Sequence, residues 1–259
     1  MGNRVQTAPD YLPNDSIVIV LGPTGSGKST FINNVVGEAV APTSPGLDSC
    51  TTTIRGYRVP FKHDRSLPQR LFLVDTPGFD AILDNIDASR TFKDLCEWLK
   101  IAHCQGATVG AMVYIFGCTN RVANSYCEDL KIFQEMCGKD FLPKVVLCVT
   151  GGDSDKDATD QRMEALRQSV RWEPLLQAGA SMGHLKNSST SATEVVKKLA
   201  GTGAFNRTCT LALMDELADH KSPDQTASGK SLRSWFKESR TYKALKNLRR
   251  LFGFHRIGV

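Results

Sequence analysis

The sequence predicts an α/β fold in three layers, with a mostly parallel sheet covered by helices on both faces. Four short segments are apolar at almost every position, as expected of strands buried on both faces; they lie at residues 17–21, 71–74, 110–116 and 145–149. Segments with a helical period alternate with them, such as the face formed by Phe92, Leu95 and Leu99. Strands that alternate with helices form parallel sheets with right-handed crossovers. Ligands of such sheets bind at the carboxyl ends of the strands.

The composition is that of a globular domain. The chain has 259 residues, of which 41% are hydrophobic and 23% are charged, so a sizeable core is available. No apolar run approaches the roughly 18–20 residues that span a bilayer. The N-terminal residues are polar and do not resemble a secretory signal.

The cysteines and histidines do not form a metal-binding or disulfide pattern. None of the eight cysteines belongs to a C-x-x-C pair, and most lie in apolar segments, where a free thiol acts as a small core side chain. The five histidines lack the spacing of zinc ligands. Reduced thiols indicate a cytosolic or nuclear compartment, and we expect a cytoplasmic protein.

The first apolar segment leads directly into GPTGSGKS, which satisfies G-x-x-x-x-G-K-[ST]. A glycine-rich turn lets backbone N–H groups approach a phosphate, and the helix that follows adds its N-terminal dipole. Lys28 would neutralise the β and γ phosphates, and the hydroxyl of Ser29 would bind Mg²⁺. The sequence therefore predicts a P-loop NTPase fold. The candidate nucleotide-binding residues of this loop are Gly22, Gly25, Ser26, Gly27, Lys28, Ser29 and Thr30.

Two further motifs complete the expected phosphate site. DTPG follows the second apolar segment, so Asp75 could hold Mg²⁺ through water and Gly78 could donate its N–H to a γ-phosphate. A GTPase also needs a threonine on a loop that γ-phosphate and Mg²⁺ order. Thr51 and Thr52 are candidates, whereas Thr53 is expected to begin the next strand.

The segment VLCVTGGDSDKDATD (residues 146–160) has two interpretations. GTPases carry [NT]-K-x-D at this place, and here Thr150 and Asp153 keep the threonine and the guanine-reading aspartate, while Gly151 replaces the lysine. The alternative is a calcium loop that starts at Asp153. Ala158 stands where that loop needs glycine, and the preceding segment is a strand, so the base-reading interpretation is favoured. The later aspartates would then cap a helix over about 159–170.

Together, GPTGSGKST, DSCTTT, DTPGFD and VTGGD resemble the septin-like (paraseptin) branch of P-loop GTPases. This group includes immune-associated nucleotide-binding proteins, chloroplast-import receptor GTPases and small fungal G-domain proteins, and the last are the most similar. The resemblance covers residues 14–220. It implies binding of GTP or GDP with Mg²⁺, and a homodimer formed through the nucleotide face.

The resemblance also implies roles for individual residues. The implied catalytic residues are Lys28, Thr51 and Gly78, and the implied metal-binding residues are Ser29, Thr51 and Asp75. The guanine loop would lie near residues 188–192, although the same residues could instead cap the following helix.

One departure from the usual pattern concerns hydrolysis. Phe79 stands where many GTPases place a water-orienting glutamine, so intrinsic hydrolysis is expected to be slow. The missing group would come from a switch backbone, from Asp80 or from a partner subunit. Two alternatives stay open: a scaffold that binds nucleotide without turnover, and an ATP-binding enzyme, which DTPGFD disfavours.

The chain is predicted to have four parts: a flexible N-terminus (1–14), a G domain (15–220), a polar linker (221–231) and a basic amphipathic segment (232–259). Residues 230–256 contain nine Lys or Arg residues and a single acidic residue, Glu238. The helical part, 232–252, could lie on an anionic membrane, bind a protein partner or fold back on the domain. Nucleic-acid binding is not expected, because no recognised module accompanies the charge.

Overall fold

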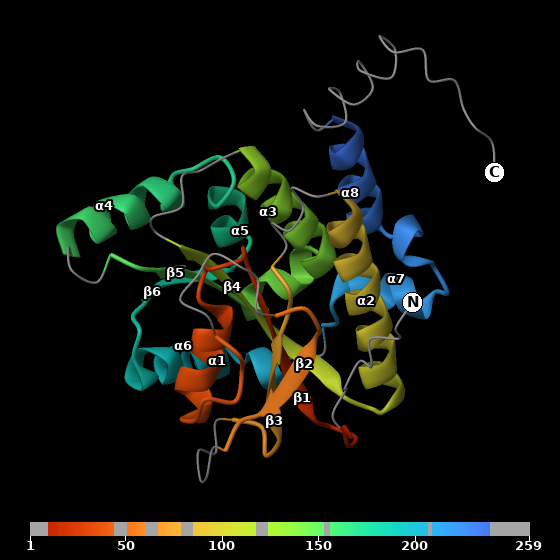
Figure 1. Ribbon diagram of the computed structural model, residues 1–259, viewed down its shortest axis with the longest axis horizontal. Coiled ribbons are helices and arrows are strands. Elements are labelled where there is room, and N and C mark those ends of the chain that lie inside the picture. The colour runs from red at the N-terminus through yellow and green to blue at the C-terminus, as the bar shows by residue number, and fades with distance from the viewer. Residues whose placement is uncertain are drawn as a thin grey trace.

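The computed structural model describes residues 10–43, 51–60, 67–78, 85–117, 124–152, 156–206 and 209–238. In these residues, six strands form one sheet in the order β2-β3-β1-β4-β5-β6 (Figure 1). Every neighbouring pair is parallel except β2 and β3. The strands are β1 (Ser16–Leu21), β2 (Arg55–Arg58), β3 (Leu71–Asp75), β4 (Thr108–Gly117), β5 (Val145–Thr150) and β6 (Ser181–Leu185).

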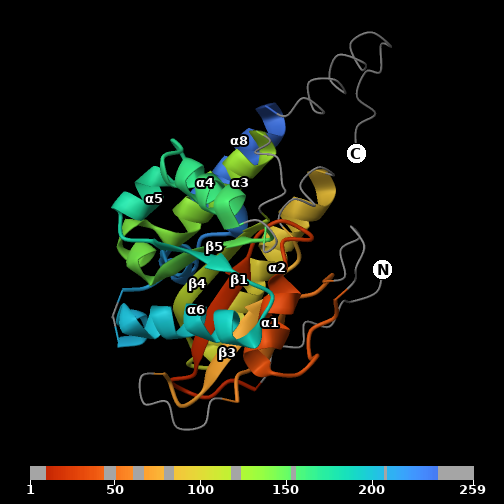
Figure 2. The same ribbon diagram turned by 90° about the vertical axis from the view of Figure 1, so that its left-hand side faces the viewer.

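Helices cover both faces of the sheet, and the predicted three-layer fold is confirmed (Figures 1 and 2). α1 and α6 pack on one face, and α2, α3, α5, α7 and α8 supply the core of the other. The helices are α1 (Lys28–Val36), α2 (Asn85–Cys104), α3 (Asn124–Cys137), α4 (Lys156–Arg167), α5 (Glu173–Gln177), α6 (Ser189–Gly201), α7 (Ala212–Ala218) and α8 (Ala227–Glu238). Short 3₁₀ turns lie at Lys139–Lys144, Ala204–Asn206 and Pro223–Gln225. No helix in the described ranges is long and apolar enough to cross a membrane.

The central strand β1 shows why its sequence is apolar without alternation. Ile17 and Ile19 point into the core beneath α2 and α3, whereas Val18 and Val20 point into the core beneath α1 and α6. Successive side chains of a strand face opposite sides of the sheet. Both sides are covered here, so each position of β1 favours an apolar residue and the strand runs straight to the P-loop.

Buried cysteines behave as core residues. Cys96, Cys137 and Cys148 are free and buried. Burial raises the pKa of the Cys96 and Cys148 thiols to about 12, and it raises the pKa of Cys137 as well. These thiols therefore stay protonated and unreactive.

Residues 10–14, which the sequence assigns to a flexible N-terminus, pack against the domain. The ring of Tyr11 is buried and makes edge contacts with Phe72 and Trp98. Asp15 accepts a hydrogen bond from Leu12 N and forms an ion pair with Arg70 at 2.5 Å. The aromatic contacts explain the difference, because a single tyrosine in a polar stretch gives no periodic signal.

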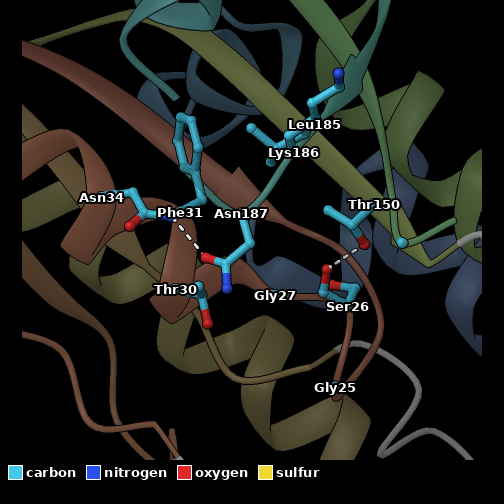
Figure 3. Close-up of a pocket in the computed structure, with 11 residues that line it drawn as sticks. Gly25, Ser26, Gly27, Thr30, Phe31, Asn34, Thr150, Leu185, Lys186 and Asn187 are labelled. Carbon is cyan, nitrogen blue, oxygen red and sulfur yellow. Dashed lines mark hydrogen bonds between the residues drawn. The ribbon is translucent and has the colours of Figure 1, made fainter. Parts of the chain in front are cut away.

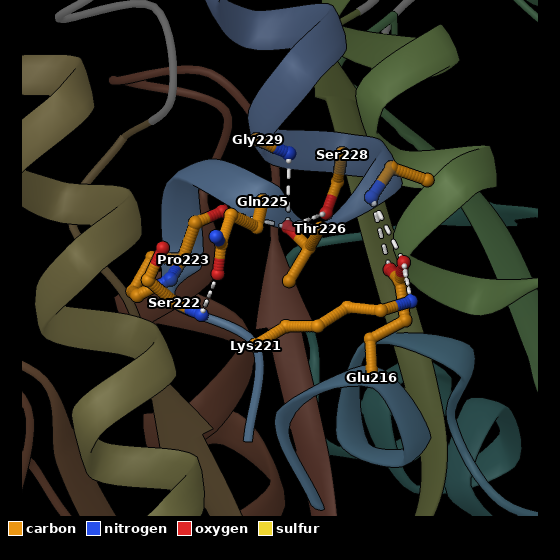
Figure 4. A network of polar contacts seen from close by, with 9 residues as sticks. Glu216, Lys221, Ser222, Pro223, Gln225, Thr226, Ser228 and Gly229 are labelled. Carbon is orange, nitrogen blue, oxygen red and sulfur yellow. Dashed lines mark hydrogen bonds and ion pairs between the residues drawn. The ribbon is translucent and has the colours of Figure 1, made fainter. Parts of the chain in front are cut away.

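The expected polar linker, 221–231, is instead a capped helix start (Figure 4). Ser222 and Gln225 form a reciprocal capping box, and the hydroxyl of Thr226 accepts from Gly229 N at 3.1 Å. The carboxylate of Glu216, on α7, accepts from Ala227 N. The polar side chains that suggested a linker therefore satisfy backbone donors at the start of α8.

The described part of the C-terminal segment folds back on the domain, which is one of the three alternatives left open by the sequence. α8 packs against α3, with Leu232 buried in the core and the hydroxyl of Ser231 donating to Glu135 of α3 at 2.7 Å. Lys230 and Arg233 are exposed on the opposite side. Residues 239–259 lie outside the described residues.

Candidate nucleotide-binding site

The P-loop connects β1 to α1 and depends on Gly22 for its path. Gly22 has φ +141°, and a Cβ at this position would lie 2.0 Å from the carbonyl oxygen of Ile115 on β4. Only glycine fits so close to a neighbouring strand. α1 begins at Lys28 with no side-chain cap and no acidic residue in its first turn. The N–H groups of this turn are therefore suited to an anion.

Lys28 lies inside the loop that it is expected to serve. Its side chain is buried, and its ammonium donates to the carbonyls of Gly22 at 2.9 Å and Pro23 at 2.8 Å. The loop thus holds a positive charge at the start of α1. This agrees with the predicted role of Lys28 as the phosphate-binding cation.

The three predicted metal-binding residues come together from three segments. Asp75 Oδ2, at the carboxyl end of β3, accepts from the hydroxyls of Ser29 at 2.8 Å and Thr51 at 3.0 Å. The two hydroxyls are 3.2 Å apart. The three side chains therefore lie together, as expected of residues that share one site, and their role in binding a metal ion stays a prediction. β2 begins at Arg55, so Thr53 precedes the strand that it was expected to start.

The electrostatics of Asp75 fit a divalent cation. The side chain is buried, and Oδ1 has no hydrogen-bond partner among the described residues. Burial raises the pKa of Asp75, opposed by the donors Ser29 and Thr51 and by the charge of Lys28. The described ranges hold no group of three His, Cys, Asp or Glu residues that could bind a metal alone. A magnesium ion would therefore need phosphate oxygens and water besides Ser29, Thr51 and Asp75, as hard cations with few protein ligands do.

Of the other residues that the sequence singles out, the structure describes Gly78 but not Asp153, Phe79 or Asp80. Gly78 is buried and follows β3 at the same edge of the sheet as Asp75. Asp153, the predicted guanine reader, lies outside the described residues, as do Phe79 and Asp80.

A pocket of about 200 Å³ opens beside the P-loop (Figure 3). Thr150, at the end of β5, contacts the P-loop across this pocket, since its hydroxyl donates to the carbonyl of Ser26 at 2.8 Å. The lining combines the P-loop, α1, the end of β5 and the residues after β6: Gly25, Ser26, Gly27, Thr30, Phe31, Asn34, Thr150, Gly151, Leu185, Lys186 and Asn187.

The guanine loop expected at residues 188–192 is displaced by a helix cap. Ser188 caps α6 by accepting from Ser191 N at 3.2 Å, so the capping alternative is the observed one. The pocket wall lies just before it, at Leu185, Lys186 and Asn187. The polar run around Ser188 suits a loop as well as a helix cap, so it placed the predicted loop a few residues after the pocket wall. The end of the strand at Leu185 would have indicated them, because ligands bind directly after strand ends.

The turn after β5 has a shape that explains the missing lysine of the base-reading motif. Gly151 and Gly152 have φ of +84° and +77°. Their carbonyls are held from two sides: Gly151 O lies 3.0 Å from His184 Nε2, and Gly152 O accepts from the hydroxyl of Thr159 at 2.8 Å. A side chain at residue 151 would be strained in this conformation.

Restoring the lysine by Gly151→Lys is therefore expected to destabilise the fold by about 1–2 kcal/mol, the cost of a left-handed non-glycine residue. Urea unfolding measures this change. Gly201→Lys serves as the control, since Gly201 is exposed at the end of α6 and a Cβ there would meet nothing within 4 Å. Equal stability of the two variants would contradict the strained turn.

Fold and site together define a P-loop nucleotide-binding protein with the sheet and loops of a GTPase domain. The chain matches the model of the AIG1 family over residues 16–177, more than half its length, and belongs to that family. The resemblance to the septin-like branch is thereby confirmed.

Two known proteins are similar in sequence to part of this chain. Immune-associated nucleotide-binding protein 3 of Arabidopsis thaliana is 25% identical over 163 residues, which is 62% of this chain and 45% of that protein. Cell division control protein 11 of Saccharomyces cerevisiae is 32% identical over 90 residues, 32% of this chain and 21% of that protein. The chain thus spans less than half the length of these two curated relatives.

Among solved structures, Toc33 from Arabidopsis thaliana in complex with GDP and Mg²⁺ has the same fold. Its TM-score is 0.54 at 17% identity, and the alignment covers 77% of this chain and 88% of Toc33.

Proposed function

We propose that this chain binds GTP and GDP with Mg²⁺ and hydrolyses GTP slowly, with a homodimer formed through the nucleotide face. The cluster of Ser29, Thr51 and Asp75 beside Lys28 carries the proposal. A P-loop lysine, two hydroxyls and one buried carboxylate form the arrangement that receives a nucleoside triphosphate and its metal ion. When bound, Mg²⁺ would neutralise charge on the phosphate oxygens.

The guanine preference rests on Asp153 and on membership of the AIG1 family. Toc33, which has the same fold, has been solved with GDP and Mg²⁺. For Toc33, dimerization is important for GTPase activity. A second subunit would supply the water-orienting group that Phe79 does not provide.

Nucleotide preference and turnover test the proposal. Displacement of a fluorescent GDP analogue by GTP, GDP and ATP measures selectivity, and Asp153→Ala is expected to erase the preference for guanine. Phosphate release per subunit should rise with protein concentration if dimerization activates the site. A wild-type chain that binds GTP but releases no phosphate at any concentration is a scaffold, and one that binds ATP equally well is not a GTPase.

Asp75→Asn is expected to raise the Mg²⁺ concentration needed for half-maximal hydrolysis by about 10- to 100-fold. This is the effect of losing a partner that acts on a metal ion through its ligands. Titration of Mg²⁺ at saturating GTP measures the shift. Asp219→Asn provides a matched control, because Asp219 is an exposed carboxylate at the end of α7. An Asp75→Asn variant with the wild-type Mg²⁺ profile would remove Asp75 from the metal site.

We also propose a cytoplasmic location. Contact between the basic segment and an anionic membrane, or a protein partner, stays a prediction. Sedimentation of the full chain with vesicles containing phosphatidylserine tests the membrane contact, with neutral vesicles as the control.

A further inference from the structure

The turn after β5 forms one wall of the pocket, yet its own residues do not fix its shape. Gly151 lines the pocket, and Gly151 and Gly152 have φ of +84° and +77°. Glycine adopts a positive φ readily, but without a Cβ it also leaves that conformation readily. Thr150 holds the start of the turn, because its hydroxyl donates to Ser26 O at 2.8 Å (Figure 3). Beyond Thr150, the shape of the turn depends on contacts with the carbonyl groups of the two glycines.

His184 makes one of these contacts from the neighbouring strand. It lies on β6, in register with Val149 of β5, and its Nε2 is 3.0 Å from Gly151 O. A carbonyl oxygen can only accept, so Nε2 carries the proton and donates. An imidazolium ring also has a proton on Nε2. The contact therefore does not depend on whether the ring is neutral or charged.

Thr159 makes the second contact from α4. Its side chain is buried, and its hydroxyl donates to Gly152 O at 2.8 Å. Thr159 lies only 7 residues after Gly152, whereas His184 lies 33 residues after Gly151. The contact from Thr159 is therefore local, and the contact from His184 is the one that ties the turn to the next strand of the sheet.

His184 acts on the turn from outside the pocket. Successive side chains of a strand face opposite sides of the sheet. Leu185 lines the pocket and packs in the core beneath α1 and α6, whereas Met182, which shares the side of His184, packs in the core of the opposite face. His184 is not among the described residues that line the pocket. It can therefore influence a bound base only by way of the turn.

We propose that His184 is a positioning residue for the guanine-reading turn: by holding Gly151 O, it keeps the two glycines in the conformation from which Asp153 reads the base. Gly151 stands where the [NT]-K-x-D motif has lysine, and two successive glycines lose more conformational freedom than other residues when they are ordered. The hydrogen bond orders the turn before a nucleotide arrives, so less entropy is lost when the base binds. This inference rests on the proposed function and adds to it a residue that acts on base selectivity without touching the base.

Displacement of a fluorescent GDP analogue by GDP and by ADP tests the inference on the full chain. His184→Phe keeps a ring and removes the donor, and it is expected to weaken GDP binding about 5-fold, the size of one net hydrogen bond, and to leave ADP binding unchanged. His184→Gln should keep most of the wild-type affinity, because its amide nitrogen is the same number of bonds from Cα as Nε2 of histidine and also donates. His103→Phe is the matched control, at an exposed histidine in the last turn of α2, and should leave both affinities unchanged.

The same substitution in the Asp153→Ala background separates positioning from a general loss of structure. If His184 acts through the turn that leads to Asp153, His184→Phe costs no further GDP affinity once the aspartate is gone. An undiminished cost in that background would overturn the inference. So would an equal loss of GDP and ADP affinity, an unchanged GDP affinity in His184→Phe, or a His184→Gln variant as weak as His184→Phe.

The proposed function stands in each of these cases as long as the wild-type chain prefers GDP to ADP. A wild-type chain that binds neither nucleotide, or both equally well, would overturn the proposed function and this inference with it.

Discussion

Lys28→Ala is expected to weaken the binding of GTP and GDP by about 100-fold, which corresponds to about 3 kcal/mol. The ammonium of Lys28 is buried at the start of α1, where it donates to two carbonyls of the P-loop. A phosphate that enters the loop would exchange these neutral acceptors for charged oxygens. Hydrogen bonds in which both partners are charged are about twice as strong as neutral ones.

The measurement is the dissociation constant of a fluorescent GDP analogue and its displacement by GTP, with thermal unfolding in parallel. Lys139→Ala, at an exposed lysine far along the chain from the P-loop, is the control for a lost charge. The unfolding temperature of Lys28→Ala without nucleotide should stay close to that of the wild-type chain, because water can replace the ammonium at Gly22 and Pro23. Nucleotide binding within a few-fold of wild type would show that the P-loop of this chain does not hold phosphates.

The grouping of the candidate phosphate- and metal-binding residues could be predicted from the sequence because these residues are tied to backbone features that local sequence specifies. The strand before Gly22 is apolar on both faces, and the glycines and Lys28 follow it without a gap. Asp75 likewise ends a fully buried strand. Parallel strands bring their carboxyl ends to one edge, so Ser29 and Asp75 had to meet once both strands were recognised.

The base end was harder to predict because it depends on where a weak strand stops. β6, with the sequence SMGHL, has only two buried residues, Met182 and Leu185, and its apolar pattern does not show its end. The serine-rich run after it is equally suited to a loop or a helix cap, and the structure uses Ser188 as a cap. The pocket residues after Leu185 could therefore be predicted only if the end of β6 were recognised.

Long-range polar contacts account for the misassigned linker. Ala227 N is satisfied by Glu216, and Ser231 donates to Glu135, 96 residues earlier in the chain. A polar stretch looks like a solvated loop when its partners are distant in sequence. Within residues 221–231, Ser222, Gln225 and Thr226 satisfy nearby backbone donors and Ser231 reaches Glu135, and together with Glu216 they fix the start of α8.

Gly22→Ala is expected to destabilise the fold by about 3 kcal/mol or more, since it adds backbone strain to a steric overlap. Gly22 has φ +141°, which side-chain-bearing residues rarely adopt, and its Cβ would lie 2.0 Å from Ile115 O. That oxygen belongs to β4, the parallel neighbour of β1 in the middle of the sheet. Neither backbone can retreat without separating the two central strands or moving the P-loop.

Urea unfolding measures the loss, and a total stability of about 5–15 kcal/mol leaves a folded variant to observe. Gly201→Ala is the matched control: a Cβ there would meet nothing within 4 Å, and α6 should gain about 0.5–1 kcal/mol from replacing a helical glycine. If the two variants unfold at the same urea concentration, Gly22 is not pressed against β4. If Gly22→Ala folds but binds no nucleotide, the loop has moved instead of the strands. A loss of the expected size would instead show that the close approach of β1 and β4 decides whether the P-loop can form, because the loop leaves β1 at Gly22, where a Cβ would overlap Ile115 O.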